Sequence, residues 1–307
     1  MTFKELIDEL YKRSIQIDFS GGKIKYRGPE ENITSEIISG LKQYKGEVIK
    51  YFWSLKKLNL MPINPVGSRI PFVLVHGDRA NYLLSDYLGK DLPFFGFFHI
   101  GSEGEQIPFN TVEEFADHYI KQLELLVPKG PIILSGFSFG GIVAYEMALM
   151  LQKKGYEILC LIVIDSLHPA AKELYRKQPS LYLHIRRNII SPLYQGLLKR
   201  VKRLICTFYF TIKKPLIKQL RKFYVLDKYY IVWEKYLPGK FDGKMVLYRA
   251  EGNKSSYEYL GWDKGVDDIQ LELLPGFHET MFLPEEGAHL LKESMKIIIE
   301  NHSVKSK

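Results

Sequence analysis

The chain has 307 residues, 46% of them hydrophobic and 25% charged, a composition that excludes collagen-like and disordered chains and leaves room for a sizeable core. No apolar run reaches the roughly 18 residues of a membrane-spanning helix. Glu5, Asp8 and Glu9 occupy the segment where a secretory signal would be basic and then apolar, so we expect a cytoplasmic protein. The formal net charge of +8 is uneven, because residues 172–222 hold fourteen lysines and arginines but one acid, Glu173; such a segment favours an anionic partner.

The first 57 residues predict a helix, a β-hairpin and a helical end. Apolar residues recur at helical spacing in FKELIDELYKR, and alternation with a period of two follows over residues 15–19. Ser-Gly-Gly at 20–22 can form a tight turn into a second strand, KIKYR. Thr34 or Ser35 can cap a further helical stretch, with Gly46 as a possible break.

A hairpin of two strands leaves strand edges without a partner. The second strand carries Lys23, Lys25 and Arg27 on one side, so its edge can accept an acidic extended peptide as a third strand. The alternative is a solvated basic strand whose charges protect the edge from aggregation. The residue pattern alone leaves both interpretations open.

This segment resembles the small N-terminal docking domain of the TubC type, found on subunits of nonribosomal peptide and hybrid polyketide synthetases. The resemblance covers about residues 1–55, through the LIDEL-type first helix, the IQIDFSGGKIKY hairpin and the helical end ITSEIISGLKQYKGEVIKYF. It implies a small α+β domain that receives the C-terminal tail of the preceding synthetase subunit, for which Lys23, Lys25 and Arg27 are the candidate binding residues.

Prolines then indicate a domain boundary. Pro62, Pro65 and Pro71 interrupt any helix, and the residue before each proline is held in extended geometry. Residues 58–68 therefore predict a short, stiff linker. The chain divides on this reading into a domain over 1–57 and a larger one over 69–303.

Beyond the boundary, PFVLVHG and PFFGFFHI predict buried strands and TVEEFADHYIKQLELLV a helix. PIILSGFSFGG then predicts a strand that turns at once into the helix IVAYEMALMLQKKG. A strand, G-x-S-x-G and a helix form the context of a nucleophile elbow, whose flanking glycines avoid collisions at the tight turn. Ser138 is the predicted nucleophile. The candidate oxyanion donors are the backbone N–H of Phe139, at the start of that helix, and that of Asp78 or Arg79, in the loop after LVHG.

His278 is the predicted general base, because it follows the late strand of IQLELLPG, in the chain order that a nucleophile elbow uses. His76 lies closer to the elbow in the predicted sheet and can line the site. The acid that orients the base is less determined, since any carboxylate that reaches its Nδ1 serves. Asp165 ends the strand ILCLIVID, whereas Glu251 and Asp263 follow the next strand, KMVLYRAEG.

Residues 68–300 resemble the thioesterase domains of peptide and polyketide synthetases through LVHG, SGFSFGG, VIDS and GFHETMF in the expected order. The resemblance implies an α/β-hydrolase fold with a helical lid at about 168–240, and it implies Asp165 as the acid. It implies acyl transfer through an acyl-enzyme on Ser138, resolved by water or by a nucleophile within the acyl chain. No metal or cofactor of the chain's own is implied, since the phosphopantetheine arm belongs to the donor carrier protein.

The predicted lid holds the basic segment, in which apolar and basic residues alternate at helix-like intervals. Three roles fit this pattern: a solvated lid with an apolar underside along the acyl channel, a docking surface for an acidic carrier protein, and contact with an anionic membrane through LICTFYFTI. Membrane contact is the least favoured of the three. Nucleic-acid binding is not expected, because nothing but charge supports it.

We therefore expect a serine thioesterase that releases, by hydrolysis or macrocyclisation, a peptidyl or acyl chain from a carrier protein of a nonribosomal peptide or hybrid polyketide assembly line. Only about a dozen residues separate the predicted domains, which leaves no room for a carrier domain, so the carrier arrives in trans. The alternatives are an editing thioesterase that removes stalled acyl groups, a non-catalytic assembly scaffold and a small-molecule esterase.

Overall fold

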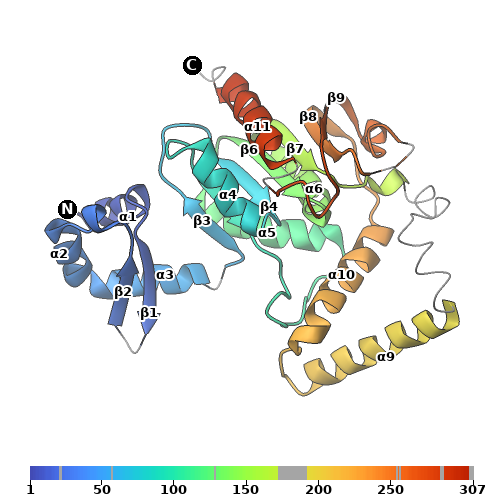
Figure 1. Cartoon of the computed structure of the whole chain (residues 1–307), viewed down its shortest axis with the longest axis horizontal. Coiled ribbons are helices and arrows are strands. Elements are labelled where there is room, and N and C mark those ends of the chain that lie inside the picture. The colour runs from blue at the N-terminus through green and yellow to red at the C-terminus, as the bar shows by residue number, and fades with distance from the viewer. Residues whose placement is uncertain are drawn as a thin grey trace.

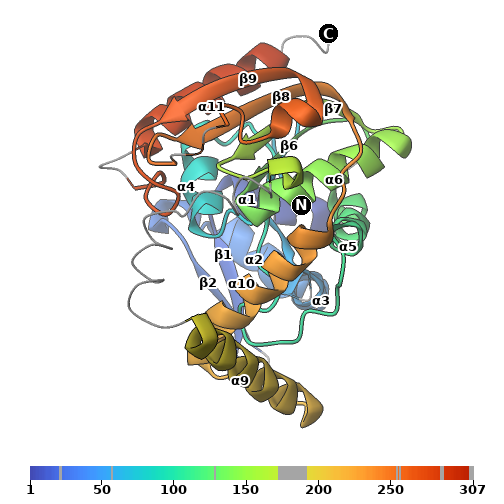
Figure 2. The same cartoon turned by 90° about the vertical axis from the view of Figure 1, so that its right-hand side faces the viewer.

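The computed structural model describes two connected units, a small N-terminal one and a larger one built around a β-sheet (Figures 1 and 2). The described residues are 1–20, 23–56, 58–127, 129–171, 192–253, 255, 257–283 and 287–303. Among the described helices, none combines the length and the apolar character needed to cross a bilayer.

The N-terminal unit follows the order expected from the sequence. Helix α1 (Phe3–Lys12) begins with a capping box, in which Thr2 and Glu5 satisfy each other's backbone N–H groups. Strands β1 (Gln16–Ser20) and β2 (Lys23–Arg27) form an antiparallel hairpin, and helices α2 (Ser35–Gln43) and α3 (Lys45–Lys56) follow. The break between these helices lies at Tyr44, two residues before Gly46.

A small apolar core holds this unit together. Leu6 and Leu10 of α1, Ile37 and Leu41 of α2, and Val48 of α3 are all buried against one another. Their spacing of three or four residues along each helix is what places them on one face. The unit thus has its own core, as the sequence pattern requires of a separate domain.

The larger unit contains a seven-stranded sheet in the order β3-β5-β4-β6-β7-β8-β9. Every neighbouring pair is parallel except β3 with β5. The strands are β3 (Leu60–Asn64), β4 (Phe72–Val75), β5 (Phe94–Phe97), β6 (Pro131–Phe137), β7 (Glu157–Ile164), β8 (Phe241–Ala250) and β9 (Val266–Leu274).

Strand β3 lies within the segment 58–68 that the prolines predict to be a linker. Residues 60–64 instead pair with β5 and form one edge of the sheet, so the linker prediction is wrong for them. Pro62 is tolerated because an edge strand has a side that needs no backbone donor. Asn64 secures the end of the strand through Nδ2, which donates to the carbonyl oxygens of Lys90 (2.9 Å) and Leu92 (2.7 Å).

Helices cover both faces of the sheet, as expected for parallel strands. One face packs against α5 (Val112–Leu126) and α6 (Phe139–Lys153), and the other against α4 (Arg79–Leu88) and α11 (Ala288–Ser303). Strand β4 shows how one strand serves both faces: Val73 and Val75 point into the first core, and Phe72 and Leu74 into the second. This layered arrangement fixes the carboxyl ends of β4, β6 and β7 along one edge.

Two helices of the predicted lid are described, α9 (Pro192–Thr211) and α10 (Lys218–Lys235). Figure 1 shows α10 between α9 and the larger unit, with α9 outermost. Tyr229 and Val232 of α10 are buried in the core that also contains α5 and α6. Residues 172–191 of the predicted lid lie outside the described part of the chain.

Candidate active site

Ser138, His278 and Asp165 meet at the carboxyl edge of the sheet, although 113 and 140 positions separate His278 from its two partners. The Ser138 hydroxyl oxygen lies 3.0 Å from His278 Nε2, and His278 Nδ1 lies 2.7 Å from Asp165 Oδ2. A carboxylate only accepts, so Nδ1 carries the proton and Nε2 is left to accept from the serine hydroxyl. The three residues selected from the sequence thus form one hydrogen-bonded chain.

Ser138 lies at a tight turn between β6 and α6. Its backbone has φ 55° and ψ −124°, a conformation that non-glycine residues rarely adopt. A side chain at Gly136 would collide with the Gly140 backbone, and one at Gly140 would collide with the Val75 carbonyl. The two flanking glycines therefore permit the close approach that exposes the serine at the sheet edge.

Positive φ angles recur along the same edge of the sheet. His76 (φ 60°) and Asp78 (φ 44°) follow β4, Ser138 follows β6, and Asp165 (φ 41°) follows β7. Backbone strain of this kind persists only where the surrounding structure enforces it, and it concentrates at functional sites. Hydrogen bonds enforce it here, since Ser138 N donates to Ile164 O (3.0 Å) and Asp165 N donates to Tyr248 O (2.7 Å).

Asp165 is held in place on both carboxylate oxygens. Its side chain is only 1% exposed, and Oδ1 accepts from Ala250 N (3.2 Å) and Asn253 Nδ2 (3.1 Å) while Oδ2 faces His278. Neither alternative acid takes this place: Glu251 is exposed, and Asp263 is exposed and paired with Lys264 (3.1 Å). The structure thus brings Asp165, and not these two, to the histidine.

Phe137 supports the histidine ring from the residue before the serine. The Phe137 and His278 rings stack with centroids 4.8 Å apart and planes 20° from parallel, while Phe282 meets Phe137 edge-on at 4.9 Å. The imidazole is therefore oriented by packing as well as by Asp165. The sequence analysis did not predict this contact, because an apolar residue directly before the serine of G-x-S-x-G indicates only the end of a buried strand.

The candidate oxyanion donors all lie at helix N-termini. Phe139 is the first residue of α6, Asp78 is the N-cap of α4, and Arg79 is the first residue of α4. The first N–H groups of a helix lack intrahelical acceptors and lie at the positive end of the helix dipole. Both segments therefore present donors suited to a developing negative charge.

His76 is buried beside the elbow, and its surroundings keep it neutral. Its Nε2 lies 2.8 Å from the Tyr119 hydroxyl, and burial, together with the neighbouring His99, holds the pKa of His76 well below its usual value. A ring closed off in this way is poorly placed to take a proton from Ser138. His76 therefore lines the underside of the site and leaves the base position to His278.

The candidate docking residues lie on the N-terminal hairpin. Lys25 and Arg27 of β2 are exposed and pair in register with Asp18 and Gln16 of β1. Ile24, between the lysines, packs on the core of the unit. The Lys23 side chain lies outside the part of the chain whose side chains are described.

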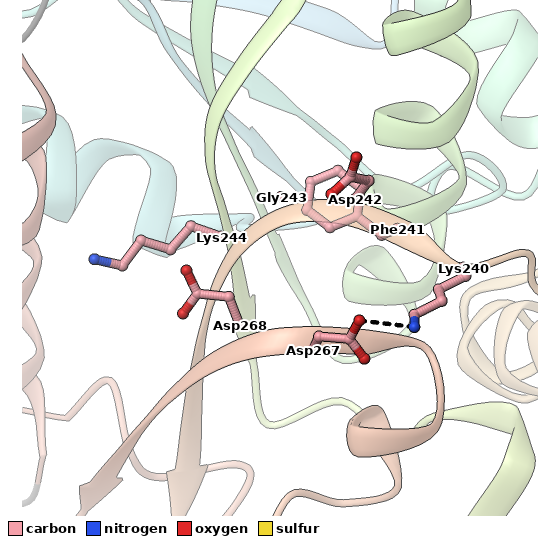
Figure 3. A pocket seen from close by; sticks show the side chains of 7 residues that line it. All are labelled: Lys240, Phe241, Asp242, Gly243, Lys244, Asp267 and Asp268. Carbon is pink, nitrogen blue, oxygen red and sulfur yellow. Dashed lines mark ion pairs between the residues drawn. The ribbon is translucent and has the colours of Figure 1, made fainter.

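A pocket elsewhere on the sheet is unrelated to this chemistry. It is lined by the residues drawn in Figure 3, at the amino ends of β8 and β9, with Lys240 and Asp267 paired at 2.7 Å. In a parallel sheet the amino ends lie opposite the carboxyl ends, so this pocket and Ser138 occupy opposite edges. Ligands of open α/β sheets bind at the carboxyl edge.

Helix α9 presents an apolar stripe to solvent. Leu197, Val201, Leu204 and Phe208 recur every three or four positions, with exposed fractions of 59, 42, 69 and 60%. One predicted role of the lid was to line an acyl channel with its apolar side. Helix α9 does not fit this role, because its apolar stripe faces solvent. Patches of this kind on a protein surface indicate an interaction site.

The other side of α9 faces α10. Lys199 and Arg203 both pair with Asp227 of α10, at 2.8 and 2.6 Å, and Cys206 is buried between the helices with Leu220. The pKa of Asp227 is lowered by the hydrogen bonds and charges of these two cations, which outweigh its partial burial. Arg200, in contrast, is exposed on α9.

Family comparisons match both units. Residues 82–190 match the model of the thioesterase domain, and residues 4–53 match that of the TubC N-terminal docking domain. The chain is similar to a dimodular nonribosomal peptide synthase of Bacillus subtilis (strain 168), with 36% identity over 112 residues, or 35% of this chain and 5% of that protein. It is similar to the malpinin synthetase of Mortierella alpina, with 31% identity over 139 residues, or 42% of this chain and 2% of that protein.

A third relative, an inactive atromentin synthetase of Paxillus involutus, is 29% identical over 142 residues, or 45% of this chain and 15% of that protein. The chain spans only these small fractions of the length of its curated relatives.

Solved structures are similar in fold to the larger unit. The thioesterase domain from the nocardicin cluster aligns with a TM-score of 0.54 at 23% identity, covering 78% of this chain and 96% of that one. The type II thioesterase from the borrelidin biosynthetic cluster aligns with a TM-score of 0.52 at 16% identity, covering 80% and 95%. The expectation of an α/β-hydrolase fold preceded by a small docking domain is confirmed.

Proposed function

The chain carries a thioesterase domain behind a TubC N-terminal docking domain, and from this premise we propose that it is a serine thioesterase that releases a peptidyl or acyl chain from a carrier protein. The carrier belongs to a nonribosomal peptide or hybrid polyketide assembly line and is recruited in trans. The observation that carries this proposal is the chain of hydrogen bonds from Asp165 through His278 to Ser138, at 2.7 and 3.0 Å.

The proposed reaction proceeds in two acyl transfers. His278 Nε2 takes the Ser138 proton as Oγ attacks the thioester carbonyl, and the N–H groups of Phe139 and Asp78 stabilise the oxyanion. The tetrahedral intermediate collapses, the C–S bond breaks, and His278 returns its proton to the phosphopantetheine thiolate. Water, or a nucleophile within the acyl chain, then attacks the acyl-enzyme with His278 again as base, giving an acid or a macrocycle.

Every catalytic group in this scheme comes from the chain itself, and the phosphopantetheine arm arrives with the partner. The Asp165 carboxylate stabilises the imidazolium that forms in each step. Its burial makes this interaction stronger than it would be in water. The scheme is tested by incubating the protein with an acyl thioester of pantetheine and measuring both thiol release and a mass gain of one acyl group.

Two surfaces support delivery of the carrier from another chain. The exposed basic edge of β2 suits the acidic C-terminal tail of an upstream subunit. The apolar outer stripe of α9, with the exposed Arg200 on the same helix, suits the carrier protein. No carrier domain lies between α3 and β3, which are adjacent in the chain. This same arrangement favours, as a second candidate function, an editing thioesterase that clears stalled acyl groups from carriers of another chain.

Charge reversal on the hairpin is expected to separate docking from chemistry. The double variant Lys25→Glu/Arg27→Glu should raise KM for the acyl-loaded carrier of the upstream subunit by about 10-fold, because docking supplies effective concentration. Turnover of a free acyl-pantetheine thioester should stay unchanged, since the hairpin lies on a separate unit. Steady-state kinetics on both substrates measure this.

The matched control for the hairpin is Lys42→Glu, which reverses an exposed charge on α2 of the same unit and should leave both substrates unaffected. An equal loss on the free and the carrier-bound thioester in the double variant would contradict the docking role.

A further inference from the structure

Tyr229 of α10 lies between the two segments that bear the candidate oxyanion donors. Its ring stacks on Phe139, with centroids 4.2 Å apart and planes 14° from parallel, and on His76, at 5.4 Å and 9°. Phe139 carries one donor, and His76 precedes the other by two residues. A single side chain from the predicted lid thus contacts both halves of the site.

The ring is fixed in this position by its surroundings. Tyr229 is only 4% exposed, and Phe115 of α5 meets it edge-on at 5.7 Å. At its polar end, the hydroxyl lies 3.2 Å from His99 Nδ1 and 3.5 Å from Ile100 O. Burial raises the pKa of Tyr229, so the hydroxyl stays protonated and available for these bonds.

Tyr229 stacks on one strained residue, His76, and on Phe139, the residue next to the strained Ser138. His76 has φ 60° and Asp78 φ 44°, so the loop after β4 needs external support to hold its N–H groups in place. The facing helix α6 begins at Phe139, directly after Ser138 (φ 55°). A rigid ring packed against both segments sets their separation, which is the geometry that an oxyanion demands of two donors.

We propose that Tyr229 is a positioning residue, through which lid helix α10 holds the oxyanion donors of the loop after β4 and of α6 at the spacing that acyl transfer requires. This rests on the proposed serine thioesterase function. The stacking of the Tyr229 ring on His76 and Phe139 holds the donors in place. The hydrogen bonds of the Tyr229 hydroxyl only orient the ring. The lid thereby acts on the rate of the chemical step and not only on access to Ser138.

The test compares three variants of the full chain. Tyr229→Leu removes the ring but keeps apolar volume, Tyr229→Phe keeps the ring and loses the hydroxyl, and Tyr224→Leu is the matched control. Tyr224 lies on the same helix and anchors it elsewhere, because its hydroxyl accepts from Ile107 N (2.8 Å) and its ring packs on Phe210 at 4.9 Å. Thermal unfolding measures how much stability each substitution on α10 costs.

With an acyl-pantetheine thioester, Tyr229→Leu should lower kcat by about 10- to 100-fold, the range expected when oxyanion donors are displaced, while KM changes less than about 3-fold. Tyr229→Phe should stay within about 3-fold of the wild type. Tyr224→Leu should also keep kcat within about 3-fold of the wild type, even if its unfolding temperature falls as much as that of Tyr229→Leu.

A boronic acid analogue of the acyl group gives a second readout. Ser138 Oγ adds to boron and His278 takes the proton, so a tetrahedral boronate forms whose oxygen occupies the oxyanion position. Its affinity should fall with kcat/KM in Tyr229→Leu, whereas a non-hydrolysable amide analogue of the thioester should bind as it does to the wild type.

The outcomes separate the inference from its premise. Equal kcat in Tyr229→Leu and the wild type, or equal losses in Tyr229→Leu and Tyr224→Leu, would overturn the positioning role while leaving the thioesterase proposal intact. A wild type that neither releases thiol nor gains an acyl mass would overturn both.

Discussion

Replacing Ser138 with alanine is expected to abolish acyl-enzyme formation and to lower turnover of an acyl-pantetheine thioester by about 10⁴- to 10⁶-fold, as removal of a hydrolase nucleophile does. The physical reason is that the substitution removes the hydroxyl that His278 Nε2 faces at 3.0 Å, which is the group that the proposed base would activate. Intact-protein mass spectrometry provides the direct measurement. The wild type should gain the mass of one acyl group, and the variant none.

The matched control is Ser135→Ala, which makes the same change in β6, the strand that leads into the turn at Ser138. Ser135 is fully buried in β6, three residues before the nucleophile. This variant should acylate within about 3-fold of the wild type, since loss of one buried hydroxyl perturbs stability more than chemistry. An acyl adduct that persists in Ser138→Ala would show that another residue is acylated and would contradict the proposed mechanism.

Replacing Asp165 with asparagine is expected to lower kcat by roughly 10³- to 10⁴-fold while preserving the fold, because the amide has the same shape but cannot hold His278 in the required tautomer. One amide oxygen can still accept from Ala250 N and Asn253 Nδ2, so the buried side chain keeps partners there. The loss should fall on kcat more than on KM, since Asp165 contacts the base and not the substrate.

Glu251→Gln and Asp263→Asn are the controls for Asp165, because both were plausible acids on sequence grounds. Each is exposed, and each variant should retain activity within about 2-fold of the wild type. If Glu251→Gln or Asp263→Asn lost activity and Asp165→Asn kept it, the acid would have to be reassigned.

Most of the candidate site could be predicted from the sequence because the pattern that marks it is local. A serine between two glycines, preceded by a buried strand and followed by a helix, can adopt only a narrow set of backbone conformations, so Ser138 and Phe139 were identifiable at once. Chain order then selected His278. The acid could not be chosen in the same way, because the residue pattern allowed Asp165, Glu251 or Asp263. The carboxylate that reaches His278 Nδ1 is selected by how β7 and β8 pack and by the path that the chain takes after each strand.

Two further features required the tertiary structure. Strand β3 forms where prolines predicted a linker, because pairing with β5 at a sheet edge costs Pro62 no hydrogen bond. The apolar stripe of α9 turns outward, because the Asp227 ion pairs fix the other side of the helix against α10. The spacing of apolar residues in the sequence shows that a helix has an apolar and a polar face, but it does not show which face packs against another helix.

The sequence by itself was therefore enough to select the candidate serine and histidine and to predict the parallel sheet that presents them and the small domain ahead of them, since each follows from short-range pattern and chain order. Only the tertiary structure decided which acid completes the chain of hydrogen bonds and which lid residue packs against both His76 and Phe139. Tyr229 and His76 are more than 150 positions apart in the chain, and their contact exists because α10 packs on α6 and reaches the residue that follows β4. Contacts of that kind arise from the summed packing of several elements, which no local pattern records.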